Sequence, residues 1–176
     1  MEHRDHLALL RDGIADPGGV WADLGAGWGA FTLALADLLG STGTIYALDR
    51  DRTALREAAQ AVRARFPAIT LHSQVADFTQ PLDLPPLDGI VMANALHFVR
   101  DKAPVLAHIA GLLRPGGRLI LVEYDADRGN PWVPHPLAYP TWATLAARAG
   151  FRDTRRLATV PSRFLGAIYS ALSFAP

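Results

Sequence analysis

The feature that most constrains the fold of this chain is a glycine-rich turn between a predicted strand and a predicted helix. The apolar run Val20–Leu24 contains one acid, Asp23, and a helical pattern of apolar side chains follows over residues 29–39. The turn between them has three alternate glycines, Gly25, Gly27 and Gly29. Glycines suit such a turn because its backbone needs dihedral angles closed to residues with a Cβ, and because a ligand can lie directly on the chain. The helix also points its unpaired N–H groups and positive dipole end at the turn, which predicts a nucleotide-type cofactor site.

The length and composition fit one globular domain over residues 1–176. Half of the 176 residues are hydrophobic, 19% are charged, and the formal net charge is zero. Because there is no basic excess, we expect no nucleic-acid partner. The chain has no cysteine, which excludes disulfides, thiolate metal sites and thiol nucleophiles.

The N-terminal residues give no sign of a targeting segment. Residues 1–6 are too polar for a secretory signal, and no apolar run approaches the roughly 20 residues needed to span a bilayer. We therefore expect a cytoplasmic protein without a membrane partner.

Predicted strands and helices alternate five times along the chain. The strands fall at 20–24, 44–48, 69–74, 87–94 and 118–124, and the helices at 5–14, 29–39, 52–66, 141–149 and a segment capped by Asp101 that reaches Leu113. Residues 79–86 contain three prolines and are predicted to be a loop. The last two strands, 151–160 and 164–174, are joined by a short link and must be antiparallel. This order predicts an α/β fold with a doubly wound, mainly parallel sheet.

Polar residues follow several of these strands, where ligands bind in such folds. Asp49 can accept hydrogen bonds from both hydroxyls of a ribose, although it could instead help Asp51 to cap the next helix. Asp77 can accept from the amine of an adenine that packs on Phe78, unless Phe78 belongs to the core. With Asn94 and Tyr124 at the next strand ends, one cleft could gather all these side chains.

Taken together, these motifs resemble the class I S-adenosylmethionine-dependent methyltransferases over nearly the whole chain. The resemblance rests on five motifs in the family's order: Asp23–Gly29, Leu48–Asp49, Ala76–Phe78, Asp88–His97 and Leu112–Ile120. It implies a Rossmann-like sheet of seven strands with the last strand antiparallel and helices on both faces. The chain is similar to the small-molecule group that includes the ubiquinone and menaquinone biosynthesis methyltransferases, but is shorter than typical members.

The resemblance also implies S-adenosylmethionine as cofactor and assigns residues to it. Asp23 and the glycines would face its methionyl end, Asp49 its ribose and Asp77 its adenine. The full set of expected cofactor-binding residues is Asp23, Gly25, Ala26, Gly27, Asp49, Arg50, Ala76, Asp77, Phe78, Asn94 and Ala95.

Methyl transfer to a small molecule mainly requires in-line placement of the acceptor, with a base only if the acceptor is a weak acid. His97 is the candidate base or substrate contact, although a histidine in an apolar run is more often a packing or capping residue. Tyr124 is the second catalytic candidate, either bonding the acceptor or roofing the cleft. Asp125 and Asp127 lack a third ligand, so no metal is expected.

Two other functions remain open on the sequence alone. The glycine turn and Asp49 also fit an NAD-dependent oxidoreductase, but Asp23 beside the turn would repel a pyrophosphate and suits a sulfonium with an ammonium group. A non-catalytic S-adenosylmethionine-binding module would explain the short chain, which has little sequence for a substrate lid. A homodimer could complete the cleft. The acceptor atom, carbon, nitrogen or oxygen, is not fixed by the sequence.

Overall fold

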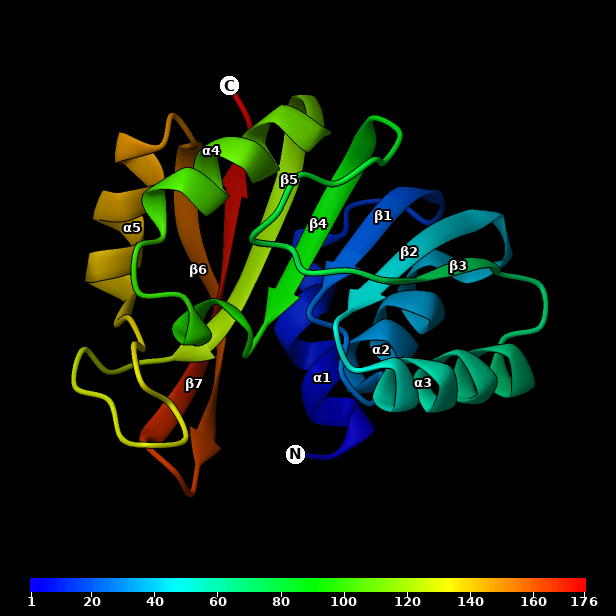
Figure 1. The fold of residues 1–176 in the computed structure, drawn as a ribbon, viewed down its shortest axis with the longest axis horizontal. Coiled ribbons are helices and arrows are strands. Elements are labelled where there is room, and N and C mark those ends of the chain that lie inside the picture. The colour runs from blue at the N-terminus through cyan, green and yellow to red at the C-terminus, as the bar shows by residue number, and fades with distance from the viewer.

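The computed structural model describes all 176 residues and contains one sheet of seven strands (Figure 1). The spatial order is β3-β2-β1-β4-β5-β7-β6. The strands are β1 Gly19–Leu24, β2 Gly43–Asp49, β3 Thr70–Val75, β4 Leu87–Ala93, β5 Leu113–Tyr124, β6 Arg152–Ser162 and β7 Gly166–Phe174. The pairs among β1 to β5 are parallel, and β7 is antiparallel to both β5 and β6. The predicted seven-stranded sheet with a reversed last strand is therefore confirmed.

Helices cover both faces of the sheet, as predicted. The apolar side chains of α1 (His3–Leu10), α2 (Ala30–Leu39) and α3 (Arg52–Arg65) share one buried cluster with one face. The helices α4 (Ala103–Leu112) and α5 (Tyr139–Arg148) pack into a second cluster on the other face. Figure 1 shows the two groups of helices on opposite sides of the strands.

Some element boundaries differ from the prediction. β5 begins at Leu113, because Leu113 pairs with Leu87 before a register shift, so the predicted turn before residue 118 lies inside the strand. The N-cap of α4 is Lys102 rather than Asp101, although the Asp101 carboxylate does accept a 3.3 Å hydrogen bond from the Ala103 amide. The start of β5 depends on pairing with a distant segment, which local sequence patterns do not report, and the shift at α4 is within the usual one or two residues at a helix end.

The connection from β3 to β4 is a loop without a helix, which agrees with its prolines. Its side chains Leu82 and Leu84 pack against the core cluster in place of a helix. As a result β3 is a mostly exposed edge strand, and the residues that follow it form a loop beside the ends of β1 and β2. No helix in the chain has both the length and the apolar character required to cross a bilayer.

Candidate active site

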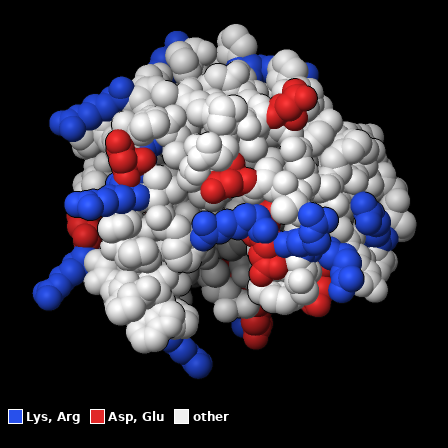
Figure 2. Space-filling model, viewed as in Figure 1, with Lys and Arg blue, Asp and Glu red and all other residues white.

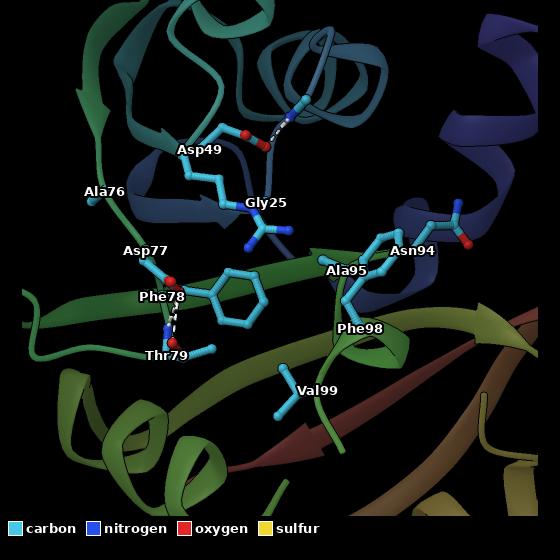
Figure 3. A pocket seen from close by; sticks show the side chains of 12 residues that line it. Gly25, Asp49, Ala76, Asp77, Phe78, Thr79, Asn94, Ala95, Phe98 and Val99 are labelled. Carbon is cyan, nitrogen blue, oxygen red and sulfur yellow. Dashed lines mark hydrogen bonds between the residues drawn. The ribbon is translucent and has the colours of Figure 1, made fainter. Parts of the chain in front are cut away.

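A cavity of about 340 Å³ opens at the carboxyl ends of the parallel strands. This volume lies within the range of small-molecule sites in proteins. Figure 3 shows Asp49, Asp77 and Phe78 on one side of it and Asn94, Ala95 and Phe98 on the other. The 12 lining residues follow β1, β2, β3 and β4: Gly25, Gly27, Asp49, Arg50, Ala76, Asp77, Phe78, Thr79, Asn94, Ala95, Phe98 and Val99. Most of the predicted cofactor residues therefore surround one cavity.

The glycine turn forms one wall of the cavity. Gly25, Gly27 and Gly29 all have positive φ angles, of 83°, 51° and 84°. A Cβ on Gly25 would lie 2.6 Å from the Ala95 Cβ, but a Cβ on Gly27 would meet no atom within 4 Å. Because Gly27 also lines the cavity, its missing side chain leaves space that a ligand can fill.

Asp49 at the end of β2 is held rigidly toward the cavity. Its Oδ2 accepts a 2.8 Å hydrogen bond from the Gly27 amide, and its Oδ1 accepts one of 2.8 Å from the Asp51 amide. Asp51, not Asp49, caps α3 by accepting from the amides of Thr53 and Ala54. Each carboxylate oxygen of Asp49 keeps a further lone pair, so the oriented group can still accept from two hydroxyls.

Asp77 and Phe78 form the wall that follows β3. Asp77 Oδ1 accepts from the Thr79 amide at 2.9 Å and from the Thr79 hydroxyl at 2.7 Å. These bonds lower the pKa of Asp77, so it is a carboxylate at neutral pH, and no protein group engages its Oδ2. Figure 3 shows the Phe78 ring turned into the cavity, where it offers a flat apolar surface.

Asn94 carries an unsatisfied acceptor in the opposite wall. Its backbone is in the left-handed region with φ of 51°, and its amide donates to the Val122 carbonyl at 2.9 Å. Its side-chain Oδ1 is buried and has no hydrogen-bond partner. Such an atom costs about 1–3 kcal/mol. Figure 3 shows the Asn94 carboxamide pointing away from the cavity, so the backbone of this residue forms the wall.

Two of the predicted cofactor residues, Asp23 and Ala26, are not among the cavity-lining residues. Ala26 is buried, with its amide bonded to the Leu48 carbonyl. Asp23 is 1% exposed, and its Oδ2 accepts a 2.6 Å hydrogen bond from the Thr32 hydroxyl. Burial raises the pKa of Asp23 to about 6, so this acid sits beneath the turn in an apolar setting.

His97 forms a buried pair with Glu123, the penultimate residue of β5. The His97 Nδ1 lies 2.9 Å from Glu123 Oε1, and the His97 amide donates to Oε2 at 3.1 Å. Both side chains are almost completely buried. Because the carboxylate faces Nδ1, that nitrogen carries the proton and Nε2 keeps the lone pair. No protein group bonds Nε2, so its lone pair has no partner within the protein.

Two aromatic rings hold the His97 imidazole in place from other directions. The Phe98 ring is 4.2 Å from the imidazole and the Tyr124 ring is 5.7 Å away, between ring centres. Phe98 also lines the cavity, whereas His97 and Tyr124 do not, so the pair lies behind the cavity wall on the side of β5. Burial and the nearby Glu123 carboxylate raise the pKa of Tyr124, which keeps its phenol neutral.

The segment after His97 is tied to the long loop between β5 and α5. The Lys102 ammonium donates to the carbonyls of Val99 at 2.7 Å and His135 at 2.9 Å. The His135 amide in turn donates to the His97 carbonyl at 3.0 Å. The loop is therefore packed against the His97 segment.

The two acids at the start of this loop are structural. Asp125 Oδ1 accepts from the Tyr139 amide at 2.9 Å, and Asp127 Oδ1 accepts from the Ala138 amide at 3.0 Å. No group of three or more potential metal-binding side chains is found in the chain. Both carboxylates thus position the start of α5.

Comparison with protein families identifies the domain. The family described as "Methyltransferase domain" matches residues 22–119, which is more than half of the chain. The chain belongs to this family. The match begins in β1 and ends in β5, so it covers the cavity and the segment that carries His97.

Curated relatives of this methyltransferase domain are longer proteins. The highly reducing polyketide synthase ACRTS2 of Alternaria alternata is 37% identical over 75 residues, 43% of this chain and 3% of that protein. The O-methyltransferase cnsE of Penicillium expansum is 32% identical over 117 residues, 64% of this chain and 40% of that protein. The demethylmenaquinone methyltransferase of Bacillus licheniformis is 30% identical over 101 residues, 57% of this chain and 43% of that protein. The chain spans less than half the length of each.

Solved structures show the same fold. A SAM dependent methyltransferase from Aquifex aeolicus aligns with a TM-score of 0.76 at 19% identity, over 98% of this chain and 90% of that one. The CurJ carbon methyltransferase aligns with a TM-score of 0.72 at 19% identity, over 94% of this chain and 50% of that one. The methyltransferase fold thus extends over nearly the whole chain.

Sequence reasoning about this methyltransferase domain missed several residues near the site. Thr79, Phe98 and Val99 line the cavity, and Glu123 holds His97. Glu123 had a sequence signal, since it is a single acid in an otherwise apolar predicted strand, as Asp23 is in β1. Lys102 had none, because its role depends on a contact with residue 135.

Proposed function

We propose that this chain is an S-adenosylmethionine-dependent methyltransferase that acts on a small molecule with a weakly acidic C–H or O–H group. The observation that carries this proposal is the buried His97–Glu123 pair, which lies directly behind a cavity built for a nucleoside. A binding module would need the cavity but not an oriented base.

The residues around the cavity fit S-adenosylmethionine in charge and shape. Asp49 offers two oriented acceptors to the ribose, and Asp77 offers its free Oδ2 to the adenine amine beside Phe78. When bound, this cofactor supplies an electrophilic methyl group on a sulfonium.

The chain's own contribution to the reaction is placement and proton removal. Glu123 fixes the imidazole so that Nε2 of His97 is the basic nitrogen, and the Phe98 and Tyr124 rings restrict its rotation. Nε2 would take the proton that the acceptor carbon or oxygen loses as this atom bonds the methyl group and the methyl–sulfur bond breaks to leave a neutral thioether, and Glu123 would stabilise the resulting imidazolium. The neutral Tyr124 phenol can donate a hydrogen bond to an oxygen of the acceptor.

A buried base argues for an acceptor that must lose a proton during the reaction. An amine that is already a free nucleophile gains little from such a pair, whereas a carbon or hydroxyl acid gains about 10²–10⁴-fold. The relatives include proteins named as a carbon methyltransferase and as an O-methyltransferase, and both acceptor types match this requirement.

Binding measurements test the cofactor. Thermal unfolding is recorded with S-adenosylmethionine, S-adenosylhomocysteine and NADH, each in excess, because a ligand of the folded state raises the melting temperature. We expect a rise with the first two and none with NADH. A rise with NADH alone would replace the proposal by the oxidoreductase.

Turnover separates an enzyme from a silent binder. The chain is incubated with a labelled methyl donor and a panel of 3-oxo thioesters and phenols, and methylated products are identified by mass spectrometry. We expect product that disappears in His97→Ala while cofactor binding is retained. Cofactor binding without product across the panel would favour the non-catalytic module.

A further inference from the structure

The exposed large hydrophobic side chains of this protein lie at the end of the sheet that carries the carboxyl ends of the parallel strands. They are Met1, Trp28, Val75, Phe98, Trp132 and Phe164. Apart from Met1, each lies at or just after the carboxyl end of a strand: β1, β3, β4, β5 and β6 respectively. Met1 precedes α1, whose N-terminus lies at the same end of the sheet in Figure 1. The opposite end of the sheet, where the parallel strands begin, exposes no large hydrophobic side chain.

Three of these residues, Phe98, Trp132 and Phe164, lie on segments next to β5 and are called the aromatic rim here. The ring of Phe98 contacts the imidazole. Trp132 belongs to the loop whose His135 amide bonds the His97 carbonyl. Phe164 is in the turn between β6 and β7, three residues before Ala167, whose carbonyl accepts from the Asp125 amide. The rim therefore comes from three segments that all join the β5 side of the site.

Such exposure requires an explanation. Phe98, Trp132 and Phe164 are 56%, 73% and 67% exposed. Clustered aromatic side chains on a surface usually mark a binding site, since covering them with apolar matter is favourable. The cofactor cavity uses only Phe98 among the three, so the other two are left for a different molecule.

The charges beside the rim favour an anion. Arg100, Arg128 and Arg163 are exposed, lie within four residues of a rim aromatic, and make no ion pair or hydrogen bond with the protein. The neighbouring acids Asp101, Asp125 and Asp127 each accept a hydrogen bond from a backbone amide, which orients them, and the three arginines outnumber the two of these acids that have no basic partner. Asp125 is also paired with Arg156 at 2.9 Å. Figure 2 shows that both basic and acidic side chains border the hollow on this face, with further basic side chains projecting outward around it.

We propose that the aromatic rim and these arginines form the acceptor site, and that the acceptor is an apolar chain carrying an anionic group such as a carboxylate or phosphate. This inference rests on the proposed function, because it takes His97 as the base. The chain lies on Trp132 and Phe164, the anion meets Arg128 and Arg163, and the reacting carbon or oxygen reaches Nε2 of His97 past Phe98.

Model ligands test this site by calorimetry with the full chain saturated with S-adenosylhomocysteine. The probes are decanoate, decyl phosphate, hexanoate and 1-decanol. We expect decanoate and decyl phosphate to bind at least tenfold more tightly than hexanoate, because four additional methylenes are buried, and at least fivefold more tightly than 1-decanol.

Surface variants assign the effect to the rim. The double variant Trp132→Ser/Phe164→Ser should remove the difference between decanoate and hexanoate, and Arg128→Glu/Arg163→Glu should remove the preference over 1-decanol. The matched controls are Val75→Ser and Arg63→Glu, which change an exposed apolar and an exposed basic residue away from the rim. Both controls should bind decanoate as the wild type does.

Other outcomes would overturn the inference. If S-adenosylhomocysteine binds but no probe does, the proposed acceptor site is contradicted and the proposed function is not. If neither S-adenosylhomocysteine nor any probe binds, the proposed function itself is contradicted. Cosedimentation with phosphatidylglycerol vesicles but no binding of monomeric decanoate would make the rim a lipid-surface contact. A dimer in analytical ultracentrifugation that Trp132→Ser/Phe164→Ser dissociates would make it an interface between copies.

Discussion

At the scale of single residues, the glycines of the turn are needed for different physical reasons. Gly25 leaves room for Ala95, and Gly29 leaves room for Ala58, whose Cβ and Cα would lie 2.6 and 2.9 Å from a new Cβ. Gly27 alone faces open space in the cavity. Gly25 and Gly29 are therefore needed for packing, whereas Gly27 is needed to leave space in the cavity.

This difference predicts separate effects for two variants. Gly27→Val places a branched side chain in the cavity, so we expect S-adenosylmethionine affinity to fall by more than about 100-fold, with strain from the positive φ costing roughly 1–2 kcal/mol of stability. Gly25→Ala, with its clash against Ala95, should instead lose more stability. Calorimetry and urea unfolding measure the two quantities, and an unchanged cofactor affinity in Gly27→Val would rule out the site.

Asp49 and Asp51 are neighbours in sequence but do different things. Removing the Asp49 carboxylate takes away two acceptors for the ribose, and charged hydrogen bonds contribute about 1.5–3 kcal/mol each. Asp49→Ala should therefore weaken cofactor binding by at least about tenfold. Asp51→Ala is the matched control, because it removes only the cap of α3 and should cost about 1 kcal/mol of stability without changing affinity. Equal affinities for both variants would contradict the ribose role.

His97 and Glu123 are expected to act as a unit. His97→Ala should lower kcat by about 10²–10⁴-fold and leave cofactor affinity unchanged, since the imidazole is not in the cavity wall. Glu123→Gln keeps the shape but can present its amide N–H to Nδ1, which favours the wrong tautomer, so kcat should fall and the double variant should add little. Single-turnover rates of the two single variants and the double variant measure these effects on the methyl-transfer step. Full activity in His97→Ala would contradict the role of His97 as a base and leave it a packing residue.

At the scale of elements, Lys102 is the contact that joins two of them. It is the only lysine in a chain that otherwise uses arginine, and it is buried. A compact ammonium on a slender stem can reach two carbonyls where a planar guanidinium is harder to place. Burial lowers the pKa of Lys102, although the nearby Glu123 carboxylate opposes this.

Lys102→Met should release the loop after β5 from the His97 segment. We expect faster hydrogen exchange at the His135 amide and a higher KM for the acceptor, while the global unfolding midpoint falls by only a few degrees. Lys102→Arg is the matched variant and should restore part of the protection, because it keeps a charged donor. Unchanged exchange at residue 135 in Lys102→Met would show that other contacts hold the loop.

The elements were predictable where local pattern decides them. Alternating apolar strands and amphipathic helices predicted the sheet, and residues at strand ends such as Asp49 and Asp77 were found because parallel strands bring their carboxyl ends to one edge. The start of β5 and the partners of His97 were not predictable in this way. Leu113 joins β5 through Leu87, and Glu123 meets His97 across two adjacent strand ends, so both depend on contacts between distant segments.

At the scale of the whole molecule, the strands of the sheet form two groups that border different parts of the site. The strands β3, β2, β1 and β4 end at the cofactor cavity, whereas β5 and β6 end, and β7 begins, on the side of the aromatic rim. His97 follows β4 and its partner Glu123 lies on β5, so the base stands at the boundary between the two groups. Transfer between two bound molecules needs this placement, because both must reach one point.

The buried Asp23 links this site to the stability of the entire fold. Its pKa is raised by burial from 3.8 to about 6, so the folded protein binds this proton more tightly than the unfolded chain. The stabilisation is complete below about pH 4 and is lost as the pH rises through 6, a change of about 3 kcal/mol. Asp23→Asn keeps an acceptor for the Thr32 hydroxyl and cannot ionise, so its advantage over the wild type should grow from pH 4 to pH 8. Urea unfolding across that range measures the difference, with Asp51→Asn as a control that keeps its cap; parallel curves for Asp23→Asn and wild type would mean that Asp23 ionises as freely in the fold as in water.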